Sequence, residues 1–229
     1  MKLLATLVLL ASTAVHAAPT EINAAYRLSA NGIPIGKVSE SYVRKGDTYA
    51  IQSVTRSDGV LKALYDEQIT VESSGRIVPA GLQPLEYIFK RAREPGKNIK
   101  ALFDWDKGVM RSFSDGKQTD VPLPRDTQDR ISVMYQFMNL DKRGDTVMMP
   151  MADGRRVEYY TYRFVGEGKL DTPVGQFDTL HYERVISEPD ERRAEVWIAK
   201  DRFNFPVRVI FDDPKGFRIE QMLVDLQVR

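Results

Sequence analysis

The sequence contains no cysteine among its 229 residues. Disulfide bonds, thiol catalysis and the usual cysteine-containing zinc sites are therefore excluded. Only two histidines are present, His16 and His181, which leaves little material for histidine metal sites or for a Ser-His-Asp triad. The sequence also lacks a glycine-rich phosphate loop and the spacing of a calcium loop. From these absences we expect no metal, no cofactor and no catalytic residue of the common kinds.

The first 17 residues have the features of a signal peptide. Lys2 gives a positive start, Leu3–Val15 is apolar, and Val15-His16-Ala17 places small residues where signal peptidase reads them. We expect cleavage after Ala17 and a mature chain of residues 18–229. The apolar run is shorter than the roughly 20 residues of a membrane span, and no second run approaches that length, so we expect no transmembrane segment. Export without disulfides fits the bacterial periplasm better than the eukaryotic secretory pathway.

The charges of the mature chain are balanced. Of 33 basic residues only Lys2 lies in the leader, which leaves 32 basic against 32 acidic residues. A net charge near zero gives no support for nucleic-acid binding, so we expect no nucleic-acid partner. A chain of this length buries about 70% of its unfolded surface, enough for one core. We therefore expect residues 18–229 to form one domain.

Apolar residues alternate with a period of two along most of the mature chain, as in Leu85-x-Tyr87-x-Phe89 and Val207-x-Val209-x-Phe211. Turn sequences rich in glycine, aspartate and asparagine separate these runs at short intervals. The pattern predicts a mainly β fold, a meander of about a dozen antiparallel strands that either pair into a sandwich or curl into a barrel. Two segments, Val157–Phe164 and Thr179–Ile186, are apolar on both faces, which predicts cover on each face by a helix or a ligand.

One segment, Thr127–Asn139, changes the period. Its apolar residues recur at the spacing of one helix face: Ile131, Met134, Tyr135 and Met138. Asp126 and Asp129 are placed to cap the start of a helix. The pattern predicts an amphipathic helix. A shorter helical turn is expected at Val60–Leu64.

The remaining polar residues give weak signals for chemistry. His181 lies within a strand pattern and no nucleophile elbow occurs, which favours a hydrogen-bonded structural histidine. Carboxylate pairs such as Asp104 and Asp106 fall in turns, where aspartate commonly caps its own backbone. A basic cluster between Lys90 and Lys100 could receive a phosphate or carboxylate headgroup, although such charges are more often solvated.

The methionines are unevenly distributed, since five of eight lie within 18 positions. Thioether side chains adapt to varied apolar shapes, so this region could line a cavity for flexible, lipid-like ligands. Core packing and ligation of Cu(I) are the alternatives. The candidate cavity residues combine these methionines with aromatic residues of the predicted helix, of the two-sided strands and of the segment after residue 190. They are Met134, Tyr135, Met138, Met149, Tyr160, Tyr162 and Trp197.

Three stretches together resemble the motifs of one family of exported bacterial proteins. They are Asp129-Arg130-Ile131-Ser132 running into Met134–Phe137, Val196–Asp201 followed by Phe205–Val209, and Tyr26-Arg27-Leu28 leading to Gly32–Gly36. The family is domain of unknown function 3108 (DUF3108), and the resemblance covers nearly all of the mature chain. It implies a curled antiparallel sheet or a half-open β-barrel with one amphipathic helix packed at or in the opening, similar in outline to the periplasmic lipoprotein carriers, whose half-open barrels hold acyl chains. The family has no assigned activity or catalytic residues.

Our leading hypothesis is a non-enzymatic periplasmic protein that binds a lipid-like or amphipathic component of the cell envelope inside a curled β-sheet. A first alternative is a protein-interaction or envelope-assembly factor whose barrel is filled by side chains and whose partner is another envelope protein. A second alternative is a carboxylate-based hydrolase, which requires acidic side chains to converge in one cleft.

Overall fold

The computed structural model describes residues 18–139, 146–188, 192–212 and 216–229. The expected signal peptide, residues 1–17, lies outside this part of the chain. The strands are β1 (Glu21–Ala30), β2 (Ile33–Lys45), β3 (Thr48–Ser57), β4 (Gln68–Val78), β5 (Gly81–Arg91), β6 (Ile99–Asp104), β7 (Val109–Ser114), β8 (Lys117–Pro122), β9 (Gln128–Asp129), β10 (Thr146–Ala152), β11 (Val157–Thr172), β12 (Gly175–Val185), β13 (Arg193–Ala199), β14 (Phe205–Asp212) and β15 (Arg218–Val228). The helices are α1 (Gly59–Leu64) and α2 (Ser132–Gln136), with the 3-10 turns η1 (Pro95–Lys97) and η2 (Phe137–Asn139).

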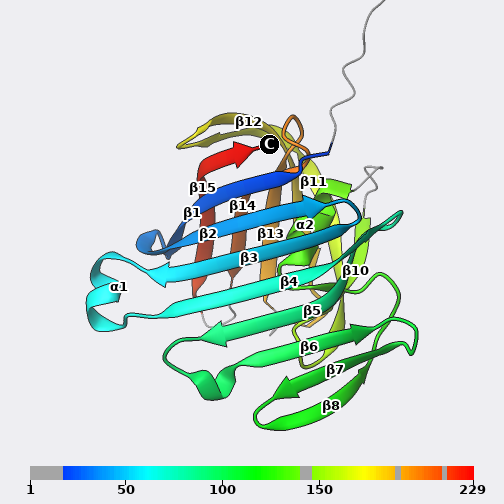
Figure 1. Cartoon of the computed structure of the whole chain (residues 1–229). Helices are drawn as coiled ribbons and strands as arrows, with labels where there is room; N and C mark the ends of the chain where they lie inside the picture. The colour runs from blue at the N-terminus through cyan, green and yellow to red at the C-terminus, as the bar shows by residue number, and fades with distance from the viewer. Residues whose placement is uncertain (1–17, 140–145, 189–191, 213–215) are drawn as a thin grey trace, which may run out of the picture.

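All these strands belong to one sheet, in the order β8-β7-β6-β5-β4-β3-β2-β1-β15-β14-β13-β12-β11-β10-β9. Neighbouring strands are antiparallel except for β9, which runs parallel to β10. The first and last strands pair with each other in the middle of the sheet, with Ile22 opposite Val228. The edge strands β8 and β9 do not pair with each other, so the sheet is curled and not closed (Figure 1). The mainly β fold predicted from the alternating pattern is confirmed.

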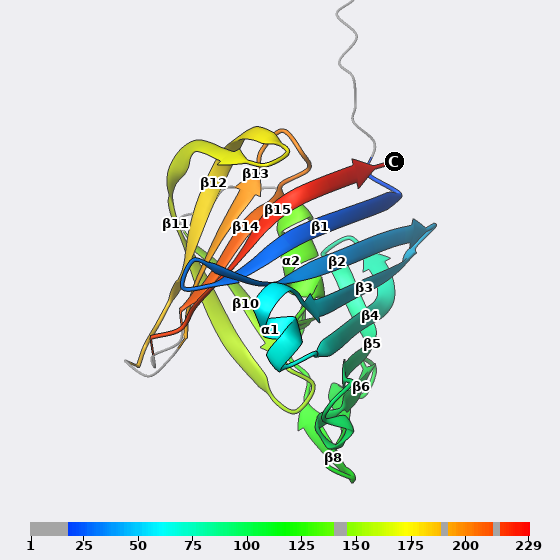
Figure 2. The ribbon, with the colours of Figure 1, turned by 90° about the vertical axis from the view of Figure 1, so that its left-hand side faces the viewer.

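Helix α2 lies on the concave side of the curled sheet, between the wing of β1–β8 and the wing of β10–β15 (Figure 2). On one side Ile131 and Tyr135 join a buried cluster with residues of β1–β5 and β12–β15. On the other side Val133 and Phe137, both fully buried, pack against residues of β10–β14. A helix that is covered on both sides can carry apolar residues on both faces. In this protein the helix fills the space between the wings.

The helix is shorter than the predicted Thr127–Asn139. Residues Gln128–Asp129 form strand β9, the α-helix starts only at Ser132, and η2 ends the segment at Asn139. The cause is the Asp129 side chain, whose Oδ1 accepts the backbone N–H groups of Ile131 (3.0 Å) and Ser132 (2.8 Å). The predicted capping role of Asp129 thus holds the turn before the helix. Asp126 has no such role in the described structure, because it is exposed with a φ of 60°.

Asp129 also ties the helix start to the sheet. Its Oδ2 accepts a hydrogen bond from Ser73 Oγ on β4 (2.5 Å), and Ser73 Oγ lies 3.0 Å from Tyr49 Oη on β3. Asp129 and Ser132 are fully buried. Burial raises the pKa of Asp129 to about 6 although the hydrogen bonds from Ser132, Ser73 and Ile131 oppose the rise. The network fixes α2 against β3 and β4 from within.

The prediction of two-sided cover is wrong for β11. Tyr162 is buried against Phe137, but Tyr159 and Val165 are 59% and 49% exposed, so the outer face of this strand meets solvent. In β12 both faces are partly covered, with Leu180 and Thr179 each 2% exposed. The predicted helical turn near Val60–Leu64 is present as α1, and Asp58 caps it by accepting the Gly59 N–H. Among the helices of the described residues, none is long and apolar enough to cross a membrane.

Replacing Asp129 by alanine tests this anchor. The change leaves two buried backbone N–H groups and the Ser73 hydroxyl without their acceptor, and each lost buried partner costs about 1 to 3 kcal/mol. We expect Asp129→Ala to lower the free energy of unfolding by about 3 kcal/mol, measured by urea denaturation at pH 7. Asp126→Asn is the control, since asparagine tolerates a positive φ, and it should change the free energy by less than about 0.5 kcal/mol. Equal effects of the two substitutions would contradict the anchor.

Candidate functional site

A pocket of about 270 Å³, here named the opening pocket, lies beside α2 at one end of the concave side. It lies between the end of β2, the turn from β4 to β5, the α2–η2 segment and the connection from β13 to β14. Its walls combine apolar and aromatic side chains with two cations and no carboxylate. The lining residues are Ala18, Pro19, Tyr42, Arg44, Ile77, Leu82, Tyr135, Met138, Lys200, Phe203 and Asn204.

Local backbone geometry brings these residues together. Ile77 and Leu82 are paired across the β4–β5 turn, and Gln136 of α2 holds this turn by donating to the Ala80 carbonyl (2.7 Å) and accepting the Leu82 N–H (2.9 Å). A Cβ at Gly81 would lie 2.4 Å from the Gln136 side chain, and the φ of Gly81 is +110°, so glycine is required there. The helix and the turn therefore form one wall of the pocket.

The opposite wall contains an unusual turn. Phe203 and Asn204, in the connection between β13 and β14, have φ values of 57° and 53°. Asparagine tolerates the left-handed region, but a bulky aromatic residue rarely occupies it. Such conformations persist where surrounding structure fixes them and are frequent near ligand sites. The conformation of Phe203 could not be predicted from the sequence, because only Asn204 belongs to the residue types that favour it.

A second, smaller void lies deeper on the concave side. It measures about 20 Å³, room for about one water molecule. Glu40 of β2 lines it, and the Glu40 carboxylate accepts hydrogen bonds from Ser53 Oγ (3.2 Å) and Tyr135 Oη (3.3 Å). Burial raises the pKa of Glu40 to about 7, against the opposing effect of these two hydrogen bonds. Glu40 was not among the sequence candidates, although an acid between the inward positions Val38 and Tyr42 was a visible signal.

The structure brings three of the seven candidate cavity residues together. Tyr135 lines both spaces, Met138 lines the opening pocket, and Met134 lines the inner void. Met149 and Tyr162 are 6% and 2% exposed and fill the core beside Phe137. The interior is therefore occupied by protein side chains, and the larger space lies at the opening.

The other two candidates lie elsewhere. Tyr160 is partly buried beneath the guanidinium of Arg184, 3.8 Å from the ring centre. Trp197 projects from the face of β13 opposite to Val196 and stacks on His181 with ring centres 4.0 Å apart. His181 Nε2 lies 2.8 Å from Glu195 Oε2, so this histidine is hydrogen-bonded as the sequence suggested.

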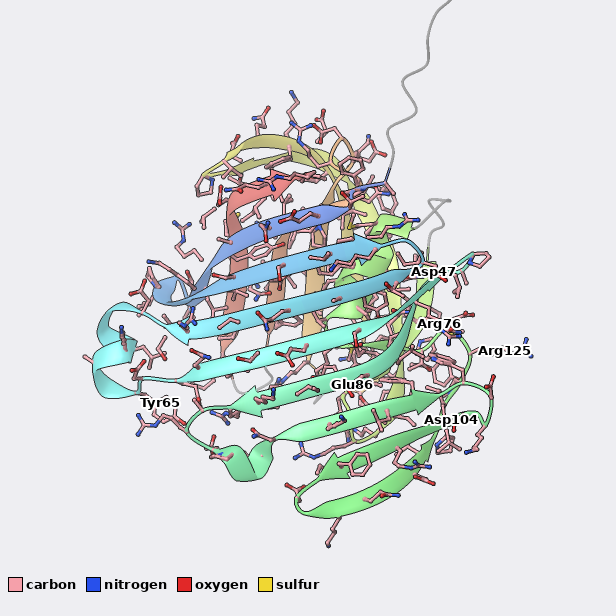
Figure 3. All side chains as sticks on the ribbon, in the orientation of Figure 1. Asp47, Tyr65, Arg76, Glu86, Asp104 and Arg125 are labelled. Carbon is pink, nitrogen blue, oxygen red and sulfur yellow. The ribbon has the colours of Figure 1, made fainter. Side chains whose placement is uncertain are left out.

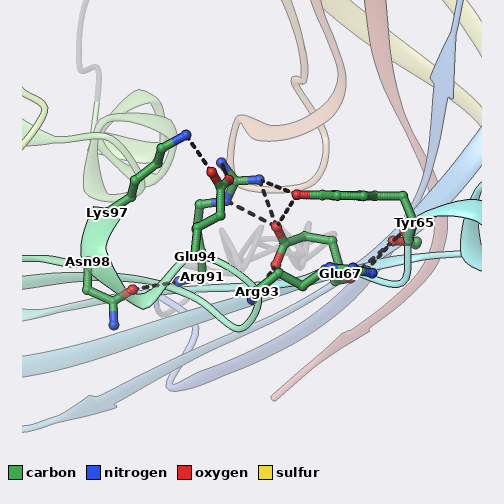
Figure 4. A network of polar contacts seen from close by, with 8 residues as sticks. Tyr65, Glu67, Arg91, Arg93, Glu94, Lys97 and Asn98 are labelled. Carbon is green, nitrogen blue, oxygen red and sulfur yellow. Dashed lines mark hydrogen bonds and ion pairs between the residues drawn. The ribbon is translucent and has the colours of Figure 1, made fainter.

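The basic cluster between Lys90 and Lys100 is neutralised by carboxylates. Arg91 binds Glu67 through Nε (3.1 Å) and Nη2 (2.7 Å) and also pairs with Glu94 (Figure 4). Glu94 pairs with Lys97 as well. Desolvation raises the pKa of Glu67, but the hydrogen bonds and charge of Arg91 outweigh it, so the pKa is lowered. This network joins the ends of β4 and β5 and leaves little positive charge for a ligand.

The outer face of the wing β1–β8 carries paired charges as well. Lys100 Nζ lies 2.8 Å from Glu86 Oε2, and Glu86 is labelled on this face in Figure 3. The aspartates of the β6–β7 turn behave as predicted, since Asp104 Oδ1 accepts the Lys107 N–H at 3.1 Å. Among the residues that the structure describes, no group of three or more potential metal ligands is present.

Replacing Glu40 by glutamine tests the raised pKa. Because the native state holds the Glu40 proton more tightly than the unfolded chain, its stabilising effect is complete below about pH 4.5 and is lost as the pH rises through about 7. A shift of this size corresponds to up to about 3 kcal/mol, and we expect about 2 because the side chain is partly exposed to the void. Glu40→Gln should therefore stabilise the protein relative to wild type by about 2 kcal/mol more at pH 8 than at pH 5.

The measurement is urea denaturation of both proteins at the two pH values. Glu86→Gln, on the outer face, is the control, and its effect on the free energy of unfolding should be similar at both pH values. A Glu40→Gln effect that is also independent of pH would refute the raised pKa.

Comparison with solved structures shows the fold. A β-barrel-like protein of the domain of unknown function DUF1849 from Brucella abortus matches with a TM-score of 0.61 and 13% identity, over 92% of this chain and 98% of that chain. A candidate lipoprotein from Parabacteroides distasonis has a TM-score of 0.38 and 9% identity, with 92% and 96% of the two chains covered. A candidate outer-membrane lipoprotein-sorting domain from Vibrio parahaemolyticus has a TM-score of 0.29 and 9% identity, with 91% and 85% covered. The first match supports a barrel-like fold, and the other two scores are too low to carry an argument.

The sequence comparisons give the family. No curated protein is a significant match to this chain. A family model described as a protein of unknown function (DUF3108) matches residues 25–223, which include every strand from β2 to β14. This match contains all three stretches on which the resemblance was based. The chain therefore belongs to the DUF3108 family of proteins of unknown function.

Proposed function

We propose that this protein binds a lipid-like, amphipathic component of the bacterial envelope in the opening pocket and does not transform it. The observation that carries the proposal is the pocket of about 270 Å³ at the open end of a curled sheet, with walls formed by Tyr42, Ile77, Leu82, Tyr135 and Met138. Ligand pockets typically combine such apolar walls with a few polar groups at the rim. The proposal includes export through residues 1–17, a periplasmic location and one domain over residues 18–229.

The size of the pocket limits how the ligand binds. Small-molecule sites usually measure about 300 to 1,000 Å³, so the opening pocket takes part of an acyl chain and not a whole lipid. Each buried CH₂ contributes about 0.8 kcal/mol, so about five or six groups give a free energy near 4 to 5 kcal/mol. Helix α2 fills the deeper space, where the void is only about 20 Å³. The ligand thus rests on α2 at the opening.

The composition of the pocket supports binding over chemistry. Arg44 and Lys200 are its charged residues, and no acidic residue lines it. General acid–base hydrolysis by carboxylates requires two acids across one cleft, which this pocket does not offer. The raised pKa of Glu40 belongs to a void that has room for about one water molecule.

Native mass spectrometry of the exported chain, purified from a periplasmic extract without detergent, tests the proposal. We expect an adduct of lipid mass that is lost on denaturation. Met138→Asp places a charge in the pocket wall and should reduce the adduct at least about tenfold, because a charged group in an apolar contact must be desolvated. Met148→Asp is the matched control, since Met148 is 65% exposed on β10.

Loss of the adduct must be separated from loss of folding. Met138→Trp provides the second variant, because a larger side chain fills the pocket without adding charge, and it should also reduce the adduct. Thermal unfolding of each variant shows whether the fold is retained. Adducts of equal intensity in wild type, Met138→Asp and Met138→Trp would place the ligand outside the opening pocket.

One observation favours a second function, an interaction with another envelope protein. Met148, Thr161 and Val185 are directly opposite one another on β10, β11 and β12, and Tyr159 lies on the same face. Met148, Tyr159 and Val185 are 65%, 59% and 43% exposed, which makes an apolar patch on the outer face. Photo-crosslinking in the periplasm from position 159 should yield a discrete product that Met148→Asp removes, whereas Met138→Asp should not affect it. A product that is unchanged by Met148→Asp would refute this function.

A further inference from the structure

We propose that the opening pocket selects amphipaths with an anionic headgroup, a carboxylate or a phosphate, and that Arg44 is the residue that binds it. This inference rests on the proposed function and adds the chemical class of the ligand. It is based on the charge of the pocket and on the hydrogen-bonding state of its two cations.

Arg44 is held at the rim with donors to spare. It follows Tyr42 by two residues on β2, so both side chains are on the concave face. Its backbone N–H binds the Thr20 carbonyl (2.8 Å), and its Nε donates to the Gly46 carbonyl (3.0 Å). Burial raises the pKa of Tyr42 and the charge of Arg44 opposes this rise, and both side chains line the opening pocket.

The terminal nitrogens of Arg44 lack a counterion. Arginine has five N–H donors, and within the described part of the chain no carboxylate lies at ion-pair distance from this residue. Arg91, by contrast, is paired with both Glu67 and Glu94. Arg44 is partly buried and lines an apolar pocket. The planar guanidinium of an arginine suits a carboxylate or a phosphate, which it binds through two parallel hydrogen bonds.

Lys200 provides the second cation, but its charge is already used. Its Nζ lies 2.5 Å from Glu167 Oε2, and Glu167 does not line the pocket. A bound anion therefore competes with Glu167 for Lys200. Arg44 makes the larger contribution, and Glu167 weakens anion binding by holding the lysine away from it.

Calorimetric titration of the exported chain with single-chain probes of equal length, below their micelle concentrations, tests the inference. The probes are dodecanoate, dodecyl phosphate, neutral glycerol monododecanoate and cationic dodecyltrimethylammonium. We expect both anions to bind at least about tenfold more tightly than the neutral probe at low salt, a preference that falls as salt is added. The ratio between dodecanoate and dodecyl phosphate distinguishes a fatty-acid headgroup from a phospholipid-like one.

Variants assign the preference to residues. Arg44→Gln should remove the preference for anions and leave the affinity for glycerol monododecanoate unchanged, whereas Arg44→Lys should retain part of it. Glu167→Gln should increase the anion affinity about two- to threefold by releasing Lys200. Arg76→Gln is the matched control, because it removes the same charge from an exposed arginine of β4 (Figure 3) and should have no effect.

The outcomes separate this inference from the function on which it rests. If wild type binds the anionic and neutral probes equally, or if Arg44→Gln and Arg76→Gln behave alike, the headgroup assignment is wrong and the apolar pocket stands. If wild type binds none of the four probes and carries no native adduct, the proposed function fails and this inference fails with it.

Discussion

The enclosure of α2 by the curled sheet is the constraint on which the rest of the structure depends. A sheet of this width exposes a large concave face. In the described structure, the five-residue helix α2 and the turn η2 after it cover that face and contact both wings. Val133 and Phe137 pack against β10–β14, and Tyr135 contacts both Tyr42 of β2 and Phe205 of β14, so the helix joins the two wings. The size of the space that remains between the wings depends on how deeply α2 and η2 extend between them.

Polar contacts decide where the helix is placed. Asp129 turns the chain before the helix and fastens it to β4 through Ser73, while Gln136 fastens the helix end to the β4–β5 turn. Buried hydrogen bonds of this kind add modestly to stability when they are made, but an unpaired buried partner is strongly destabilising. They therefore favour one position of the helix over other positions with similar apolar packing. These two contacts determine the shape of the opening pocket, because Tyr135 lies between them and Met138 follows Gln136 by two residues.

The sequence was informative about the fold and less so about the site. Period-two alternation in segments such as Val207–Phe211 reports which face of a strand is buried, and this local signal is enough to predict a mainly β, antiparallel fold. It cannot report which side chains share one pocket, so it does not separate Met138, which lines the opening pocket, from Trp197, which stacks on His181. The length of α2 was overestimated because the 3.6-residue period continues through residues whose backbone Asp129 holds in a turn. Arg44 and Glu40 lie in ordinary strand patterns, and only the three-dimensional arrangement shows that one lacks a counterion and the other borders a void.

The pairing of β1 with β15 has a consequence for the order of folding. These strands are about two hundred residues apart in the chain, yet each completes the hydrogen-bonded ladder of the other at the centre of the sheet. Contacts between such distant segments form late, because the entropy of closing the intervening chain must be overcome first. A chain that emerges with its N-terminus first therefore keeps one edge of β1 open until the last strand arrives. Synthesis that stops before β15 leaves the two wings unjoined, so all the strands from β1 to β15 are needed for this sheet to be continuous.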